Sequence, residues 1–170
     1  MGGWSASKEE GVGILMLYFA YGSNLDYSQM KNRCPSARFI EKAFLKGYDF
    51  DFTRKSTTRG CGVMDIVKSD GKLVWGVVYQ IDKLDLGKLD QSEGYAPGRA
   101  MNAYRRIECM VYEDGNTENP FTAMTYEVVE KAKSTIRPNQ AYKTLIINGA
   151  SYWHLPEDYI NKLRLIGTID

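Results

Sequence analysis

Residues 15–25 have the sequence LMLYFAYGSNL, in which a short apolar and aromatic run meets a Gly-Ser-Asn break. Such a run followed by such a break is typical of a buried strand that enters a tight turn. Asn24 or Asp26 can then cap a short helix that continues to about Arg33, where a Cys-Pro pair ends it. The segment therefore predicts a strand, a turn and a helix in immediate succession.

Further strands are predicted from apolar and alternating patterns. They cover residues 37–53 (one long strand or a pair), 62–67, 73–81, 103–112 and 121–129. Ser69-Asp70-Gly71 is a turn signal, so we expect 62–67 and 73–81 to form the two arms of a hairpin. Residues 54–60 are expected to form a polar, basic loop.

A helix is predicted between Asp82 and Gly94. Asp82 can cap it, and Gly94 stands where a left-handed residue commonly follows a helix. Leu84, Leu86 and Leu89 are spaced as on one helical face, which we expect to be buried.

The order of these elements indicates the fold class. Strands follow one another mostly through turns, and two C-terminal helices begin at Pro138 and Pro156. We therefore expect an α+β fold with a mixed, largely antiparallel, barrel-like sheet and flanking helices. Residues 1–14 are expected to be a flexible leader or tag, and 15–170 a single domain.

Composition excludes several classes of protein. The 170 residues include 22 Lys and Arg and 21 Asp and Glu, so the net charge of +1 offers no attraction for nucleic acid or a membrane surface. No apolar run approaches 18 residues. Three scattered cysteines and one histidine do not have metal-ligand spacing, so we expect no metal, no cofactor and reduced thiols in a cytoplasmic protein.

One carboxylate is a candidate for acid–base chemistry. Residues 89–95 have the sequence LDQSEGY, which places Glu93 in the last turn of the predicted helix. The carbonyl end of a helix disfavours a negative charge, and Asp90 lies three residues earlier on the same face. Both effects would raise the pKa of Glu93 towards that of a general base at neutral pH, and burial would act in the same direction. A solvated residue at a frayed helix end fits the same pattern.

The turn after the first strand is a candidate anion site. A strand that stops at Gly-Ser-Asn exposes several backbone N–H groups together, which can hold an anion or a developing oxyanion. An ordinary strand-to-helix turn explains the same residues.

Tyrosines and a basic loop are candidates for ligand binding. Tyr104 and Tyr126 fall on adjacent predicted strands and Tyr142 on the following helix. Their hydroxyl groups can orient a polar ligand inside an aromatic wall, and core packing is the alternative. Arg54 and Arg59 in the basic loop could bind a ligand carboxylate, or could simply be solvated.

These motifs together resemble the γ-glutamylcyclotransferase-like family. The resemblance rests on YGSNL at the end of the first strand, LD-x-x-EG near mid-chain and a tyrosine about ten residues later. It extends through VWGVVY at 74–79 and the C-terminal pairs Tyr142-Lys143 and Leu155-Pro156, and covers about residues 17–166.

The resemblance implies a barrel-like fold with a cavity beside the first loop, and it implies specific site residues. Glu93 would be the catalytic acid and base. The loop motif would hold the glutamyl group through Tyr21, Gly22, Ser23, Asn24 and Leu25. Tyr104, Tyr126 and Tyr142 would be the pocket tyrosines.

The reaction that the resemblance implies is the closure of a γ-glutamyl amide to 5-oxoproline, with release of an amine or amino acid. The partner would be a small γ-glutamyl compound, and the oligomeric state stays open between monomer and homodimer. The glutathione-specific branch typically has YGSLI at the loop, so Asn24-Leu25 argues against that branch. A substrate that is a γ-glutamyl-capped biosynthetic intermediate fits the same motifs.

Two other classes of function remain open from the sequence. One is a non-catalytic binding module of the same fold. The other is a transferase or hydrolase with Ser23 or Cys61 as covalent nucleophile, because Cys61 lies between two glycines and could be exposed. The sequence shows no general base that could activate either nucleophile, since the one histidine, His154, is distant in sequence.

Overall fold

The computed structural model describes residues 13–170. The predicted leader, residues 1–14, therefore lies outside the described residues except for its last two. The five strands are β1 (Leu15–Ala20), β2 (Arg38–Ser56), β3 (Cys61–Asp82), β4 (Tyr104–Glu113) and β5 (Phe121–Val128). The helices are α1 (Tyr27–Arg33), α2 (Leu86–Ser92), α3 (Gln140–Tyr152) and α4 (Glu157–Arg164), with short 3-10 turns η1 (Ser23–Leu25) and η2 (Lys83–Asp85).

The strands form a closed barrel in the order β1-β3-β2-β4-β5. Four of the five pairings are antiparallel, and the barrel closes where Tyr18 of β1 pairs in parallel with Met124 of β5. The predicted class, a mixed and largely antiparallel barrel-like sheet with flanking helices, is confirmed. Loops at the ends of the barrel strands are the places where a site most readily forms.

The predicted hairpin turn at residues 69–71 is wrong. Both predicted arms belong to the one long strand β3, and both pair antiparallel with β2 rather than with each other. Lys46 pairs with Leu73 and Tyr48 with Lys68, so residues 69–72 form a bulge opposite Gly47. Turn-forming residues also favour bulges, and the 19-residue β2 offers partners to both halves of β3. The polar loop predicted at 54–60 is shorter than expected, because β2 continues to Ser56.

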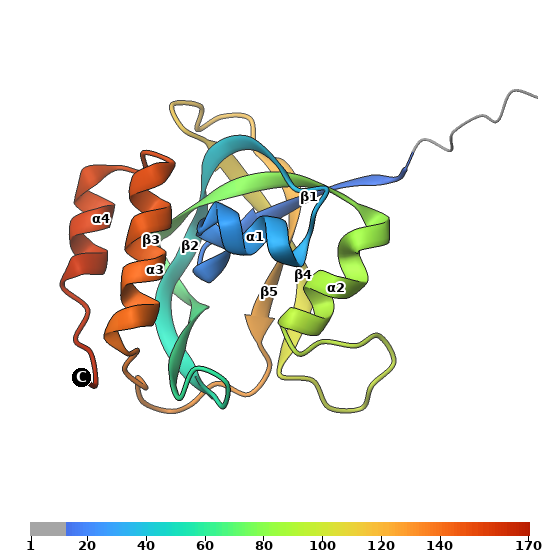
Figure 1. The fold of residues 1–170 in the computed structure, drawn as a ribbon. Helices are drawn as coiled ribbons and strands as arrows, with labels where there is room; N and C mark the ends of the chain where they lie inside the picture. The colour runs from blue at the N-terminus through green and yellow to red at the C-terminus, as the bar shows by residue number, and fades with distance from the viewer. Residues whose placement is uncertain (1–12) are drawn as a thin grey trace, which may run out of the picture.

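The helices pack on different sides of the barrel (Figure 1). α3 and α4 lie side by side at one side, and α2 lies at the other, with α1 between them in the view. Asp26, one of the two predicted caps, accepts a hydrogen bond from the Gln29 N–H at 2.8 Å and starts α1. α3 begins at Gln140 with Asn139 as its cap, two residues later than the predicted start at Pro138.

The apolar face predicted for the mid-chain helix is only partly correct. Leu86 and Leu89 are buried, but Leu84 lies in η2 and is 87% exposed. The chain enters α2 through this 3-10 turn, whose three-residue period rotates Leu84 away from the barrel. Gly94 follows α2 with φ of 63°, as predicted.

Candidate active site

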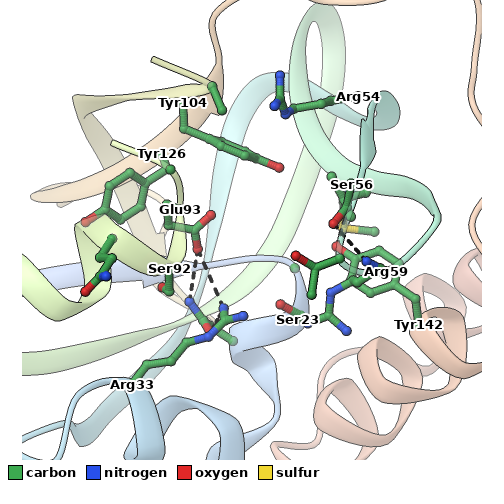
Figure 2. Close-up of a pocket in the computed structure, with 18 of the residues that line it drawn as sticks. Ser23, Arg33, Arg54, Ser56, Arg59, Ser92, Glu93, Tyr104, Tyr126 and Tyr142 are labelled. Atoms are coloured by element: carbon green, nitrogen blue, oxygen red, sulfur yellow. Dashed lines mark hydrogen bonds and ion pairs between the residues drawn. The ribbon is translucent and has the colours of Figure 1, made fainter. Parts of the chain in front are cut away.

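A cavity of about 750 Å³ opens at one end of the barrel, close to the turn after β1 (Figure 2). Its walls come from segments far apart in the sequence: the end of β1 with η1, the ends of β2 and β3, the end of α2, and β4 and β5. All the predicted site residues except Leu25 line it. This size is within the range that binds small organic ligands.

The first loop forms one wall of the cavity. The Tyr21 hydroxyl donates to the Tyr126 carbonyl at 2.6 Å, which ties the end of β1 to β5. A Cβ atom on Gly22 would lie 3.7 Å from the Tyr142 hydroxyl oxygen, so a side chain there would project into the cavity. Leu25 is fully buried outside the cavity, and its carbonyl accepts from the Trp153 indole N–H at 2.9 Å. Leu25 therefore anchors the loop from behind.

Glu93 lies where the sequence predicts, immediately after α2, with its carboxylate in the cavity (Figure 2). The Asn24 amide Nδ2 donates to Glu93 Oε1 at 3.3 Å, and the Arg33 guanidinium lies 4.0 Å from the same oxygen. The Glu93 side chain keeps 17% exposure. It is thus held by two neighbours and still open to a ligand.

Burial is the largest influence on the pKa of Glu93, and it raises that pKa above its ordinary value. The guanidinium groups of Arg33 and Arg59 and the Asn24 amide lower the pKa, and Asp90 makes the weakest of these contributions, in the upward direction. The predicted direction agrees with the structure. Of the predicted causes, burial is the largest, and repulsion by Asp90 makes the smallest contribution.

Asp90 faces a different set of groups from Glu93. It is buried, and its Oδ1 atom accepts from the Tyr126 hydroxyl at 2.6 Å, while the Arg106 Nε atom lies 3.5 Å away. These contacts join α2 to β4 and β5. Asp90 therefore fixes the helix that carries Glu93 against the sheet.

The three predicted pocket tyrosines gather around the cavity with different surroundings. Tyr142 accepts the Met64 backbone N–H at 3.0 Å, so its own proton is free to point elsewhere. Tyr126 uses its proton on Asp90. Tyr104 extends into the cavity between Glu93 and Arg54 (Figure 2). Burial raises the pKa of all three, so they stay protonated at neutral pH.

The cavity carries more positive than negative charge. Three arginines line it, Arg33, Arg54 and Arg59, against one carboxylate, Glu93. Arg59 lies over the Tyr142 ring, with its Cζ atom 4.8 Å from the centroid. The basic loop was a candidate from the sequence, but Arg33 was missed. Its position four residues after Gln29 on a capped helix beside the loop is the signal that could have indicated it.

The covalent-nucleophile alternative finds little support in this geometry. Cys61, which the sequence left open to exposure, is buried, because β3 begins there. Ser23 lines the cavity, but its hydroxyl contacts the amide of Gln29 and no base. Among residues 13–170 no three His, Cys, Asp or Glu side chains come together as a metal site would need. No helix in this range is long and apolar enough to cross a membrane.

The fold and the cavity define a small barrel protein with one partly buried acid in an arginine-rich pocket. Residues 73–163 match the AIG2-like family. The γ-glutamylcyclotransferase of Homo sapiens is 36% identical over 154 residues, which cover 88% of this chain and 78% of the human protein. The Bos taurus γ-glutamylcyclotransferase is 35% identical over 158 residues, covering 91% of this chain and 80% of the bovine protein.

A solved structure described as a γ-glutamyl cyclotransferase has the same fold. It superposes with a TM-score of 0.83 at 34% identity, covering 92% of this chain and 90% of that one. This chain therefore belongs to the AIG2-like family, among its γ-glutamylcyclotransferase-like members.

Proposed function

We propose that this chain is a γ-glutamylcyclotransferase in which Glu93 is the general acid and base. The observation that carries the proposal is the placement of one carboxylate, Glu93, whose pKa is raised, in a cavity that three arginines and several tyrosines also line. The family of the chain and the names of its relatives support the reaction class. The substrate is a small molecule that carries a γ-glutamyl group.

The reaction is an intramolecular acyl transfer. The α-amine of the γ-glutamyl unit attacks its own γ-carbonyl carbon, and Glu93 takes the proton that the attacking nitrogen loses. When the tetrahedral intermediate collapses, the bond between that carbon and the leaving nitrogen breaks. Glu93 returns the proton to the leaving nitrogen, so the products are 5-oxoproline and a free amine or amino acid.

The rest of the cavity positions the substrate and balances charge. The N–H groups of Ser23 and Asn24 stand at the start of η1, before the first hydrogen bonds of the turn, and would receive the oxyanion. The arginines would bind substrate carboxylates. The tyrosines would hold the glutamyl chain folded, so that the reacting atoms lie about 3 Å apart.

Product identification on a panel of substrates tests the reaction class. The panel contains γ-glutamyl-alanine, γ-glutamyl-ε-lysine, a simple γ-glutamylamine and glutathione, incubated in H₂¹⁸O. We expect unlabelled 5-oxoproline from at least one member, because water takes no part in the cyclisation. Labelled glutamate would instead indicate a hydrolase, and binding without any product would indicate a binding module.

A further inference from the structure

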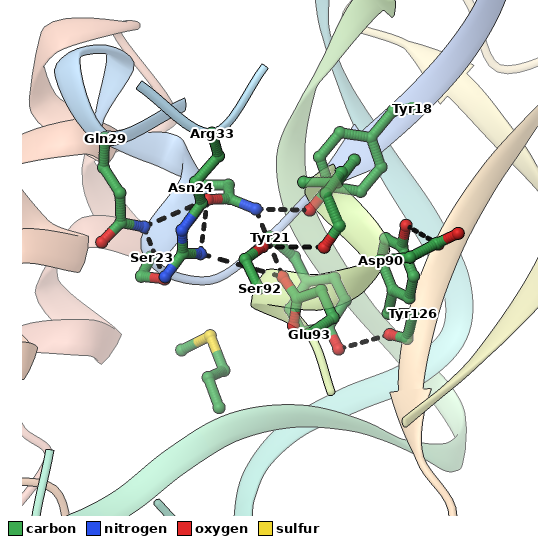
Figure 3. Close-up of polar contacts among 12 residues, drawn as sticks. Tyr18, Tyr21, Ser23, Asn24, Gln29, Arg33, Asp90, Ser92, Glu93 and Tyr126 are labelled. Atoms are coloured by element: carbon green, nitrogen blue, oxygen red, sulfur yellow. Dashed lines mark hydrogen bonds and ion pairs between the residues drawn. The ribbon is translucent and has the colours of Figure 1, made fainter. Parts of the chain in front are cut away.

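Gln29 lies on α1, immediately behind the cavity wall, and its side-chain amide makes three hydrogen bonds. Figure 3 shows the two that it donates to Ser23 and Asn24. Its Nε2 atom donates to Ser23 Oγ at 2.8 Å and to Asn24 Oδ1 at 3.0 Å. Its Oε1 atom accepts from the Arg59 guanidinium at 2.8 Å. One amide therefore connects the first loop with the basic loop on the other side of the cavity mouth.

The chemistry of these partners fixes the orientation of the Gln29 amide. An amide group has two donor hydrogens on nitrogen and an acceptor oxygen. If the amide were reversed, its oxygen would face the Asn24 oxygen and its N–H groups would face the Arg59 guanidinium. Both contacts would be repulsive, so the observed orientation is strongly preferred.

The orientation of Gln29 in turn sets that of Asn24, which is almost fully buried. Asn24 Oδ1 receives hydrogen bonds from Gln29 and from Arg33, the latter at 2.9 Å. Its Nδ2 must then point the other way, where it donates to the Tyr18 hydroxyl at 3.0 Å and to Glu93 at 3.3 Å. A reversed Asn24 would present an oxygen to the Glu93 carboxylate.

Gln29 also holds a cation of the cavity wall. Arg59 is clamped between the Gln29 oxygen and the face of the Tyr142 ring. Its positive charge is one of the influences that favour ionised Glu93. One neutral side chain, Gln29, thus contacts two of the groups that favour ionised Glu93, the Asn24 amide and the Arg59 cation.

We propose that Gln29 is a positioning residue, which fixes Asn24 as a hydrogen-bond donor to Glu93 and keeps Arg59 at the cavity. The inference rests on the proposed role of Glu93. Gln29 is not among the residues that line the cavity, so it acts through its neighbours. The charged and polar groups near Glu93 are Asn24 and Arg33 of the η1–α1 region, Arg59 of the basic loop and Asp90 of α2. Five tyrosine hydroxyl groups also act on it, those of Tyr18, Tyr21, Tyr104, Tyr126 and Tyr142.

The discriminating variant is Gln29→Glu, which keeps the shape and removes the donor. A carboxylate beside Asn24 Oδ1 would turn the Asn24 amide round, so that Glu93 loses its donor and faces an oxygen. The new charge would also pair with Arg59. Both effects favour protonated Glu93, so the acid limb of kcat/KM for γ-glutamyl-alanine moves to higher pH. In the pH range of the acid limb, we expect kcat/KM of Gln29→Glu to be about tenfold lower than that of the wild type. At high pH we expect it to recover.

Two further variants separate positioning from damage to the fold. Gln140→Glu makes the same change at an exposed site on α3. We expect the acid limb of its kcat/KM profile to lie at the same pH as in the wild type. Gln29→Met removes the contacts without adding charge. In Gln29→Met, Arg33 still donates to Asn24 Oδ1 and keeps the Asn24 amide oriented. We therefore expect the acid limb to move less than in Gln29→Glu. A uniform loss of activity at all pH values in Gln29→Glu, or an unmoved limb, would overturn the proposal.

A second readout keeps this inference separate from the proposed reaction. The pH titration of the Glu93 side-chain ¹³C carboxyl resonance is followed by NMR, with Glu93→Gln used to assign the signal. A titration that moves to higher pH in Gln29→Glu supports the positioning role even if no substrate releases 5-oxoproline. Absence of 5-oxoproline from the wild-type protein would contradict the proposed function alone.

Discussion

Glu93 is placed where its charge is costly. It follows the carbonyl end of α2 and is largely removed from water, and these conditions favour the neutral acid. Arg33, Arg59 and the Asn24 amide favour the carboxylate. The balance leaves a raised pKa, which is suitable for a group that must both accept and return a proton near neutral pH. A base of this kind reduces the stability of the folded chain.

That cost predicts an effect of pH on stability. Because the pKa of Glu93 is higher in the folded than in the unfolded chain, the unfolded chain loses its proton first as pH rises above 4.5. Wild-type stability therefore falls relative to a variant with no titrating group at this position. We expect Glu93→Gln to be more stable at pH 7 by about 0.5–2 kcal/mol, with no difference below about pH 4.

Urea unfolding of both proteins at pH 4 and pH 7 measures this difference. Equal stability at pH 7 would show that the arginines fully compensate the burial of the Glu93 charge. The sequence predicted the direction of the pKa shift from the position of Glu93 before a glycine. It indicated burial as one contribution but not as the largest, because burial depends on β4, β5 and the first loop, which the chain brings together only on folding.

At the scale of elements, the irregular segment 129–139 is held against β2 and β3 by a buried acid. Asp65 is fully buried, and it accepts from Thr53 Oγ1 at 2.7 Å, Lys131 Nζ at 2.6 Å and the Val128 backbone N–H at 2.9 Å. Backbone bonds from Ala132 and Ile136 to β2 follow along the segment. This attachment sets the path of the chain into α3, which carries Tyr142 to the cavity.

Asp65→Asn is therefore expected to be strongly destabilising. An amide would turn a donor towards Thr53 or Lys131, and Lys131, whose side chain is 31% exposed, would keep only its contact with Glu127 at 3.5 Å. We expect a cost of about 1–3 kcal/mol. Asp49→Asn is the matched control, because Asp49 pairs with Lys162 at the surface at the same 2.6 Å distance. Such exposed pairs contribute about 0–1 kcal/mol. Similar losses in the two variants, measured by urea unfolding, would contradict this assignment.

The elements also show where local sequence signals fail. Ser69-Asp70-Gly71 is compatible with a hairpin turn and with a bulge, and pairing to the distant β2 decides between them. Leu84 satisfies the helical spacing of its neighbours, but the 3-10 turn before α2 leaves it exposed. By contrast, caps such as Asp26 act within a few residues, and the sequence predicted them.

At the scale of the whole molecule, closure of the barrel assembles the site. β1 lies between β3 and β5, so the loop that follows β1 is surrounded by segments from the middle and the end of the chain. The alternation of strands and turns predicted this class of fold. The motif residues Tyr21, Asn24 and Glu93 could also be predicted, since the resemblance rests on them. The helix that follows the loop offered a signal for Arg33, but the role of Gln29 could not be predicted, because it depends on how an amide network closes in three dimensions.

The measurement that tests the central claim most directly is the rate of 5-oxoproline release by Glu93→Gln, with Glu108→Gln as control. Glu108 is an exposed glutamate on β4, so its substitution should leave the rate unchanged. The account predicts that Glu93→Gln folds, still binds the substrate and loses at least about 10²-fold in kcat. A folded Glu93→Gln protein that releases 5-oxoproline at a rate near that of the wild type would contradict it.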